Sequence, residues 1–419
     1  MPNFTQDAKL NVSILNRKLY QEAWFNTFFS KLAGFMSITD TNGIKQYNPA
    51  PNTVIQVLED FVSEGRDNML MPMELDLQEP GVYGDATLLG SGEALRLKYL
   101  QVYINQWRKA VDKLSGRMSD QRVKIYNLME RAKPALVKWW SKTENQGIFQ
   151  TIYEGGSPNL TAGTNDDGMG LSVRFHPNWY YHDGDGLITK VGTEKYTKTQ
   201  TELTADLTSA KVEAASAKMF NGLNEMITGN LLIEPLITNG GDPFWLFLAH
   251  PRTFKKIKQD TTIKSDQNAA FNAELMKHPA ISGKQMIFYD GFCIIPDPIG
   301  VRLTAESAAD HVLSLAGGDL RYGWLKPSPS TYAIANNIIL GRNALGKGLA
   351  SRLAFTEEDT DHGNTIEIGS NTIMGYNRSD FFSETDSANA FAKSKETKTV
   401  LTTAYEAVNQ SSMIIATED

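Results

Sequence analysis

Apolar residues recur at three- and four-residue spacing in three stretches of the chain, and this spacing predicts amphipathic helices. The stretches cover residues 9–36, 119–146 and about 206–227. Pro134 lies inside the second stretch, so we expect that helix to kink or to divide in two. The first stretch is rich in aromatic side chains. It is compatible both with a first core helix and with an arm that packs on a neighbouring chain.

Alternation of apolar and polar residues predicts a long hairpin near residue 70. Residues 71–77 alternate with a period of two, and residues 94–107 begin in the same way. Pro72 cannot donate a hydrogen bond to a central ladder, so the hairpin must lie at a sheet edge or form an exposed ribbon. A ribbon with a long glycine-rich loop is seldom stable alone. We therefore expect another surface, such as a neighbouring subunit, to cover it.

The second half of the chain is dominated by short apolar runs that predict strands. They lie at 244–250, 285–289, 292–297, 311–316 and 331–340, and an alternating segment follows at 352–382. Pro251 suits the first turn of a helix over residues 251–260. Strands and helices are partly segregated along the chain, which favours an α+β fold over a doubly wound sheet.

Composition and charge narrow the class of protein. The chain has 419 residues, of which 41% are hydrophobic and 21% charged, as in folded proteins. The chain has a net charge of −7, whereas a dedicated nucleic-acid-binding protein usually carries an excess of basic residues. A local basic patch is compatible with this net charge. The single cysteine, Cys293, excludes an intrachain disulfide and indicates a reducing compartment. We find no signal-peptide pattern and no run of 18 apolar residues, so we expect a soluble protein made in a cytosol.

The stretch GRNALGKG, residues 341–348, departs from a phosphate-binding P-loop by one residue. A P-loop needs Ser or Thr after its lysine to ligate magnesium, and this position is Gly348. Only a few residues separate the stretch from TEEDTDHG, which leaves little room for a helix that points its N-terminus at phosphate. We interpret the stretch as a glycine-rich turn between strands. A nucleotide-binding enzyme is the alternative.

The remaining chemical motifs are weak. His182, Asp183 and Asp185 in the segment HDGDG are candidate cation ligands, but the spacing and the bidentate glutamate of an EF-hand are missing, which favours a solvated turn. The six histidines show no zinc-site spacing, and no G-x-S-x-G elbow is present. Cys293 lies in an apolar run that is typical of a buried, inert thiol. The sequence therefore predicts neither an enzyme nor a cofactor.

The order of the parts resembles the major capsid proteins of tailed double-stranded-DNA bacteriophages, whose fold encapsulin shells share. Several segments look like those of short-tailed-phage coat proteins in the same order, over most of residues 9–382. They are RKLYQEAWFNTFFSKLAGFM, GVYGDATLLGSGEAL, GRMSDQRVKIYNLMERAKPALVKWW, FWLFLAHPRTFKKIKQD and EDTDHGNTIEIGSNTIMGYNRSDF. Their specificity lies in their order and combined length, because none is an invariant chemical signature.

The resemblance implies a division of the chain into the parts of that fold. These are an N-terminal arm (1–64), an extended E-loop (65–107), a P-domain (108–229) with a spine helix at about 119–145, an A-domain (230–350), the completion of the P-domain sheet (351–385) and a C-terminal segment (386–419). GRNALGKG would then lie where the A-domain returns to the P-domain.

The resemblance also implies a function. The subunit would assemble as hexamers and pentamers into the icosahedral head that encloses the phage genome, in the virion, after assembly in the host bacterial cytoplasm. Partners would be further copies of itself, scaffolding, portal and decoration proteins, and packaged double-stranded DNA without sequence-specific contact. No membrane is implied. A negative inner wall suits DNA that slides rather than binds. An encapsulin-like cargo shell is a second alternative.

The aromatic arm and the extended loop are the parts for which we expect contacts with neighbouring subunits. The residues predicted at these contacts are Trp24, Phe25, Phe28, Met71, Met73, Leu75, Tyr83, Arg96 and Lys98.

Overall fold

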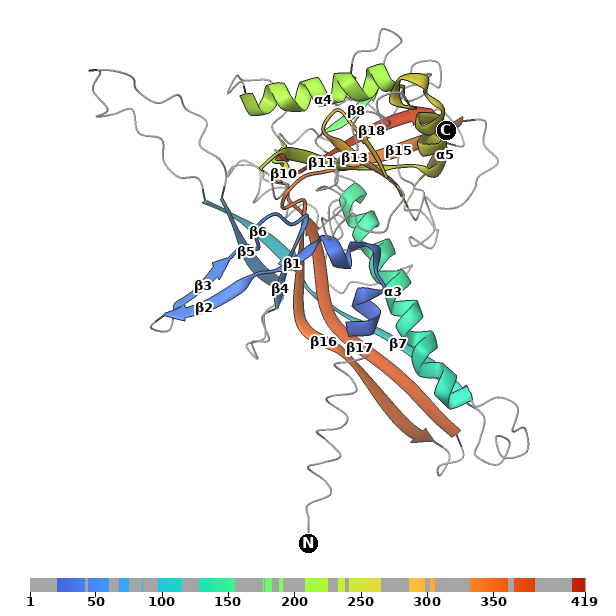
Figure 1. The fold of residues 1–419 in the computed structure, drawn as a ribbon. Helices are drawn as coiled ribbons and strands as arrows, with labels where there is room; N and C mark the ends of the chain where they lie inside the picture. The colour runs from blue at the N-terminus through green and yellow to red at the C-terminus, as the bar shows by residue number, and fades with distance from the viewer. Residues whose placement is uncertain are drawn as a thin grey trace.

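The structure is a computed structural model (Figure 1). It describes residues 21–41, 44–59, 68–74, 85, 97–114, 128–154, 176, 178–182, 188–190, 208–224, 233–237, 241–264, 286–297, 302–305, 332–360, 365–380 and 409–418.

A five-stranded sheet forms the elongated part of the molecule (Figure 1). In spatial order its strands are β1 (Ala33–Phe35), β4 (Ile55–Glu59), β16 (Leu345–Thr360), β17 (Thr365–Arg378) and β7 (Asn105–Leu114). β4 runs parallel to both β1 and β16, whereas β16, β17 and β7 are antiparallel. The long hairpin of β16 and β17 confirms the sheet expected for residues 352–382.

The helix α3 (Leu128–Glu154) lies along this sheet and packs on β17 and β7. The indole nitrogen of Trp140 donates a hydrogen bond of 2.8 Å to the Ser370 hydroxyl on β17. Pro134 lies within the helix, which continues through it, so the helix does not divide in two at this residue; the alternative, a kink, stays a prediction. Proline has no amide hydrogen, so the carbonyl four residues before it has no helical partner. The predicted start at 119 lies outside the described residues.

A nine-stranded sheet forms the second part. Its main order is β12 (Ile287–Tyr289), β13 (Phe292–Pro296), β11 (Pro243–Ala249), β15 (Tyr332–Leu340), β18 (Ser412–Glu418), β8 (Trp179–His182) and β9 (Ile188–Lys190), while β10 (Leu236–Ile237) pairs with β11 and β14 (Arg302–Ala305) with β15. The predicted strands at 244–250, 285–289, 292–297 and 331–340 are confirmed. The one predicted at 311–316 lies outside the described residues.

Each face of the second sheet buries a different apolar set. On one face, Trp245, Phe247 and Ala249 of β11 pack with the helices α4 (Ser209–Asn224) and α5 (Pro251–Gln259). Leu246 and Leu248 face the other way and join the core that runs under the five-stranded sheet. Cys293 is buried in this shared core, as expected of an inert thiol. The two sheets therefore share one hydrophobic interior, in the mixed α+β arrangement that the sequence predicts.

Four elements join the second sheet from outside the predicted A-domain range. The strands β8 and β9 and the helix α4 come from the range predicted for the P-domain, and β18 comes from the C-terminal segment. β18 lies in the middle of the sheet, antiparallel to β15 and parallel to β8. Pairing between strands so far apart in sequence leaves no local signal.

The arm is not the single helix predicted for residues 9–36. Helical backbone at residues 21–25 ends where the Thr27 hydroxyl donates to the Trp24 carbonyl at 2.7 Å. A 3-10 turn, η1 (Phe28–Leu32), and β1 follow. The break rotates Phe29 into the core, where its ring lies 4.9 Å from that of Phe149 on α3. Residues 9–20 lie outside the described residues.

A two-stranded ribbon of β5 (Asn68–Glu74) and β6 (Leu97–Tyr103) confirms the predicted hairpin. A smaller hairpin joins β2 (Ser37–Thr41) and β3 (Ile44–Asn48). At the base of the ribbon, Met69 and Met71 are buried together with Leu100 and Val102. The surface that covers this base is the subunit's own β16, rather than a neighbouring subunit.

The ribbon can lie against the first sheet because glycines face it. A Cβ on Gly346 would lie 2.8 Å from the Met71 sulfur, and a Cβ on Gly348 would lie 3.0 Å from the Met69 sulfur. A Cβ on Gly375 of β17 would overlap the backbone carbonyl oxygen of Tyr103. These glycines allow the backbones to approach.

We predict that Gly375→Ala destabilises the subunit by about 1–3 kcal/mol or more, because the new methyl group meets rigid backbone. Gly369→Ala on the same strand is the matched control, since its Cβ would meet a rotatable hydroxyl, that of Thr356, at 2.9 Å. Urea unfolding of both variants checks this. Equal midpoints would show that the ribbon does not pack on β17 as described.

Candidate functional site

The stretch GRNALGKG forms the crossover between the two sheets. β15 ends at Leu340, residues 342–343 form a turn, and β16 begins at Leu345. Asn343 has a φ of 58°, a left-handed conformation that asparagine tolerates. The segment that follows is a 16-residue strand, so no helix N-terminus is available for phosphate. The interpretation as a turn between strands is confirmed.

The turn is held by segments distant in sequence. The Gly341 amide donates to the Ser411 carbonyl at 2.8 Å, and the Arg342 amide donates to the Glu234 carbonyl at 2.9 Å. Asn343 accepts a hydrogen bond of 2.7 Å from the Gln56 side chain. A Cβ on Gly341 would overlap the Glu234 carbonyl oxygen. The crossover therefore fixes the position of one sheet relative to the other.

Lys347 lies immediately after this turn and is fully buried. Its Nζ is 3.3 Å from Oε2 of Glu144 on α3, and both side chains are almost completely inaccessible. The same ammonium lies 3.6 Å from the centre of the Trp24 ring. The ring of Tyr376 lies 5.7 Å away on another side. One side chain thus connects the arm, α3 and β16 through charge and cation–π contacts.

Burial disturbs the ionisation of both partners. Loss of water lowers the pKa of Lys347, and the Glu144 carboxylate partly offsets this effect. Loss of water likewise raises the pKa of Glu144, and the Lys347 ammonium partly offsets it. A buried ion pair adds little stability over a well-packed apolar pair, but loss of one partner leaves an uncompensated charge.

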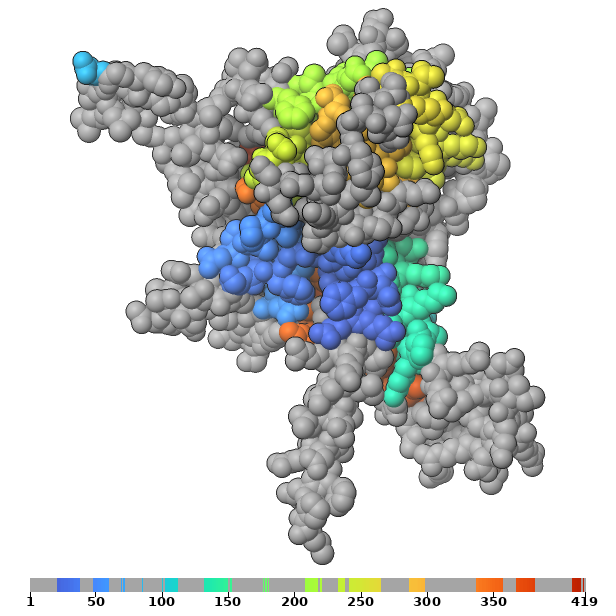
Figure 2. Space-filling view, in the orientation of Figure 1, coloured from blue at the N-terminus to red at the C-terminus, as the bar shows by residue number. Residues whose placement is uncertain are grey.

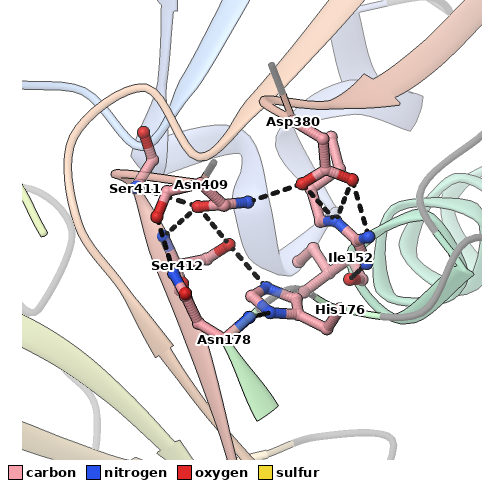
Figure 3. A network of polar contacts seen from close by, with 8 residues as sticks. Ile152, His176, Asn178, Asp380, Asn409, Ser411 and Ser412 are labelled. Atoms are coloured by element: carbon pink, nitrogen blue, oxygen red, sulfur yellow. Dashed lines mark hydrogen bonds and ion pairs between the residues drawn. The ribbon is translucent and has the colours of Figure 1, made fainter. Parts of the chain in front are cut away.

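A second polar network lies where β17 leaves the first sheet (Figure 3). The buried guanidinium of Arg378 bonds both carboxylate oxygens of Asp380, at distances of 2.6–2.9 Å. It also donates to the carbonyl of Ile152 near the end of α3 at 2.7 Å. The Asn409 amide donates to Asp380 at 2.9 Å. The last turn of α3, the end of β17 and the approach to β18 therefore meet at one charge pair.

The network continues into the second sheet. Asn409 accepts hydrogen bonds from the backbone amides of Ser411 and Ser412, and Asn178 donates to the carbonyls of Asn409 and Ser412. His176 Nδ1 accepts from the Asn178 amide at 3.1 Å, which places the imidazole proton on Nε2, 2.8 Å from the Ser412 hydroxyl. These bonds fix the start of β18 against β8.

The His176–Ser412 pair does not form a catalytic arrangement. A nucleophilic serine needs a histidine whose second nitrogen donates to an orienting group, and here that nitrogen accepts from a backbone amide. Both side chains are also buried, so a substrate cannot reach them. The arrangement is suited to holding segments together.

The predicted site residues fall into three groups. Trp24 and Met71 are buried within their own subunit, Phe28 is half-buried beside Phe149, and Phe25 is 69% exposed. Met73 and Lys98 lie in β5 and β6, with side chains outside the described part. Leu75, Tyr83 and Arg96 lie wholly outside the described residues. The intersubunit contacts stay predictions.

The candidate cation site is only partly described. His182 ends β8, and Asp183 and Asp185 lie outside the described residues. Within the described part of the chain, no group of three or more His, Cys, Asp or Glu side chains is placed to hold a metal ion. No helix in that part is long and apolar enough to cross a membrane.

Sequence reasoning missed the residues of both buried networks. The comparison with a P-loop marks the lysine of GRNALGKG only as a phosphate ligand, and the helix predicted over residues 119–146 contains Glu144 without marking it. A charged residue between two glycines in an apolar strand is a signal that could have drawn attention to Lys347. Nothing local in the sequence marks Arg378 or Asn409.

The described site is a set of polar ties that hold the two sheets, the arm and α3 together. The profile of the family described as phage capsid protein matches residues 16–406. The chain therefore belongs to the phage capsid protein family, whose members are structural subunits of the phage head. Among proteins of curated function, none matches it significantly.

Solved capsid structures have the same fold. The capsid of Ralstonia phage GP4 is 17% identical, with 88% of each chain covered and a TM-score of 0.59. The capsid of cyanophage Pam1 is 14% identical, covering 94% of this chain and 92% of its own, with a TM-score of 0.55. The acid-stable capsid of Helicobacter pylori bacteriophage KHP30 is 10% identical, covering 94% and 91%, with a TM-score of 0.57.

We predict that Lys347→Met destabilises the unassembled subunit by about 3–5 kcal/mol, because Glu144 is left buried without a counter-charge. The double variant Lys347→Met, Glu144→Leu should recover most of this loss, since both charges are then absent. Urea unfolding of the two single variants and the double variant gives the coupling free energy. Additive losses would contradict a direct interaction between the two side chains.

Proposed function

We propose that the subunit assembles the head as hexamers and pentamers, in which the ribbon of one subunit lies over the next. The observation that carries this proposal is a two-stranded ribbon whose base is fastened to its own subunit. Its base is buried on β16, and Pro72 on β5 has no amide hydrogen to donate to a further strand. Heterologous contacts that repeat around an axis close into rings of the required kind.

The arm supplies a second contact in this proposal. Trp24 and Phe29 fasten it to its own subunit, and Phe25 between them is 69% exposed. An exposed phenylalanine on a fastened segment loses little conformational entropy when a partner covers it. We assign Phe25 as the intersubunit contact of the described arm. Many such weak contacts per subunit add up across a shell.

The proposed parts of the subunit follow the predicted division, with an arm (1–64), an E-loop (65–107) and P- and A-domains. The five-stranded sheet and α3 support the P-domain, and the nine-stranded sheet supports the A-domain. Since β8, β9, α4 and β18 lie with the nine-stranded sheet, we include them in the A-domain. The order of the segments listed above supports assignment to the short-tailed-phage type.

Deletion of residues 78–92 should leave a folded subunit that does not build shells. The deletion removes the middle of the extended loop but keeps β5, β6 and the buried base of the ribbon. Circular dichroism and urea unfolding check the fold, and sedimentation with negative-stain microscopy checks assembly. Normal shells from this variant would contradict the E-loop assignment.

Phe25→Ser should weaken assembly while changing the free energy of unfolding by no more than about 0.5 kcal/mol, because the side chain is exposed. The protein concentration at which shells form should rise severalfold. Ile237→Ser on β10 is the control, since it removes an exposed apolar side chain from the other sheet. If both variants assemble like the parent, Phe25 is not a subunit contact.

A further inference from the structure

The strands β8 and β9 are attached to the second sheet by few backbone pairs. β8 pairs with β18 through Trp179, Tyr180 and Tyr181, and β9 follows β8 in the spatial order of the sheet. β18 is held much more firmly on its other side, where it pairs with β15 from Ser412 to Glu418. In Figure 2 the grey atoms hide most of this sheet, while α4 and α5, which cover one of its faces, are at the visible surface. Side-chain contacts just before β8 therefore contribute to its attachment.

His176 is the centre of these contacts (Figure 3). Its Nδ1 accepts a hydrogen bond of 3.1 Å from the backbone amide of Asn178. Its Nε2 lies 2.8 Å from the hydroxyl of Ser412, and that hydroxyl donates to Oδ1 of Asn409 at 3.3 Å. Nε2 therefore carries the proton of a neutral imidazole and donates it to Ser412. We call the contacts of His176 with Asn178 and Ser412 the histidine junction.

The histidine junction accepts only the neutral imidazole. Protonation of Nδ1 turns an acceptor into a donor, and the new N–H would face the N–H of Asn178 at hydrogen-bond distance. A buried donor that has lost its acceptor is costly. Water cannot supply the missing acceptor in the folded subunit, because the side chains of His176, Asn178 and Ser412 are all buried.

The charged and titratable groups of the surrounding elements do not offset this cost. At the end of β17, the carboxylate of Asp380 is already paired with the guanidinium of Arg378. The described end of α3 contributes the uncharged Ile152, whose carbonyl accepts from the same guanidinium. On β8, burial raises the pKa of Tyr180 to about 12, so its phenol is neutral. The first residues of β18 are uncharged.

We propose that His176 is a pH-sensitive site, and that protonation of its imidazole releases β8 and β9 from β18. The folded subunit holds this imidazole neutral, whereas the imidazole of an unfolded chain takes up a proton below about pH 6.5. Below that pH the unfolded state binds one proton more than the folded state. The stability that the junction contributes is therefore complete above about pH 6.5 and is lost as the pH falls.

The release is local. Opening of β8 alone exposes His176 to solvent and allows it to take up the proton, and a local opening needs less free energy than global unfolding. β18 keeps its pairing with β15, so the second sheet loosens only at the side of β8 and β9. The proposal concerns a single subunit and does not depend on the proposed shell.

The test compares two variants of the full-length, unassembled subunit with the parent. His176→Asn keeps an acceptor for the Asn178 amide, because the asparagine Oδ1 takes the place of Nδ1, but it cannot be protonated. Ser412→Ala removes the hydroxyl at the other end of the junction and keeps the imidazole. Urea unfolding of each protein is measured at about pH 7.5 and at about pH 5.5, on either side of the imidazole titration.

Between these two pH values, the unfolding equilibrium constant of the parent should rise about tenfold more than that of His176→Asn, since one proton is taken up over one pH unit. Ser412→Ala should be less stable than the parent at both pH values and should keep the pH dependence of the parent. That result separates titration of His176 from a merely structural role. An equal pH dependence in the parent and in His176→Asn would overturn the proposal.

Hydrogen exchange of the parent tests the local opening, and it decides the question even if His176→Asn does not fold. After correction for intrinsic exchange rates, the amides of Asn178 and β8 should lose about tenfold in protection at about pH 5.5, because they open with His176. The amides of β16 and β17 in the first sheet should keep their protection. Unchanged protection of β8, or an equal loss in both sheets, would contradict a local release.

Discussion

The burial of one ammonium group determines how the arm and α3 are arranged on the five-stranded sheet. Lys347 has no access to water, so its charge requires both the Glu144 carboxylate and the face of the Trp24 ring. These partners come from α3 and from the arm, which are separate elements. A displacement of either would leave a charge in an apolar core. The electrostatic requirement therefore fixes the arm and α3 on the same side of β16.

The tripeptide around this lysine positions the opposite side as well. Because strand side chains alternate, the glycines on either side of Lys347 face the ribbon and leave room for Met69 and Met71. The charge of Lys347 therefore positions α3 on one side of β16. The two glycines, which lack side chains, position the ribbon on the other side at the same residues of the strand. The resemblance to a P-loop is a by-product of this double requirement: the glycines serve close packing and the lysine serves a buried pair.

Elements whose signal is local were predictable from the sequence, and pairings over long distances were not. The apolar run of β11 and the proline that starts α5 are properties of a few neighbouring residues. The contact between Lys347 and Glu144 spans 203 residues of sequence, and the insertion of β18 beside β15 depends on strand partners far away in the chain. The arm was predicted as one helix because its apolar spacing is helical; the packing of Phe29 against Phe149 overrides that spacing.

The second network positions the two sheets by bonds that depend on direction. Asp380 meets Asn409 at 2.9 Å, and Arg378 reaches the last turn of α3, so the relative position of the two sheets is set by directional bonds. Apolar contacts alone tolerate sliding, whereas hydrogen bonds of defined geometry lose their energy when the partners shift. A closed shell repeats one intersubunit geometry many times. An angular error between the two sheets would recur in every copy, and the directional ties at this junction limit that error.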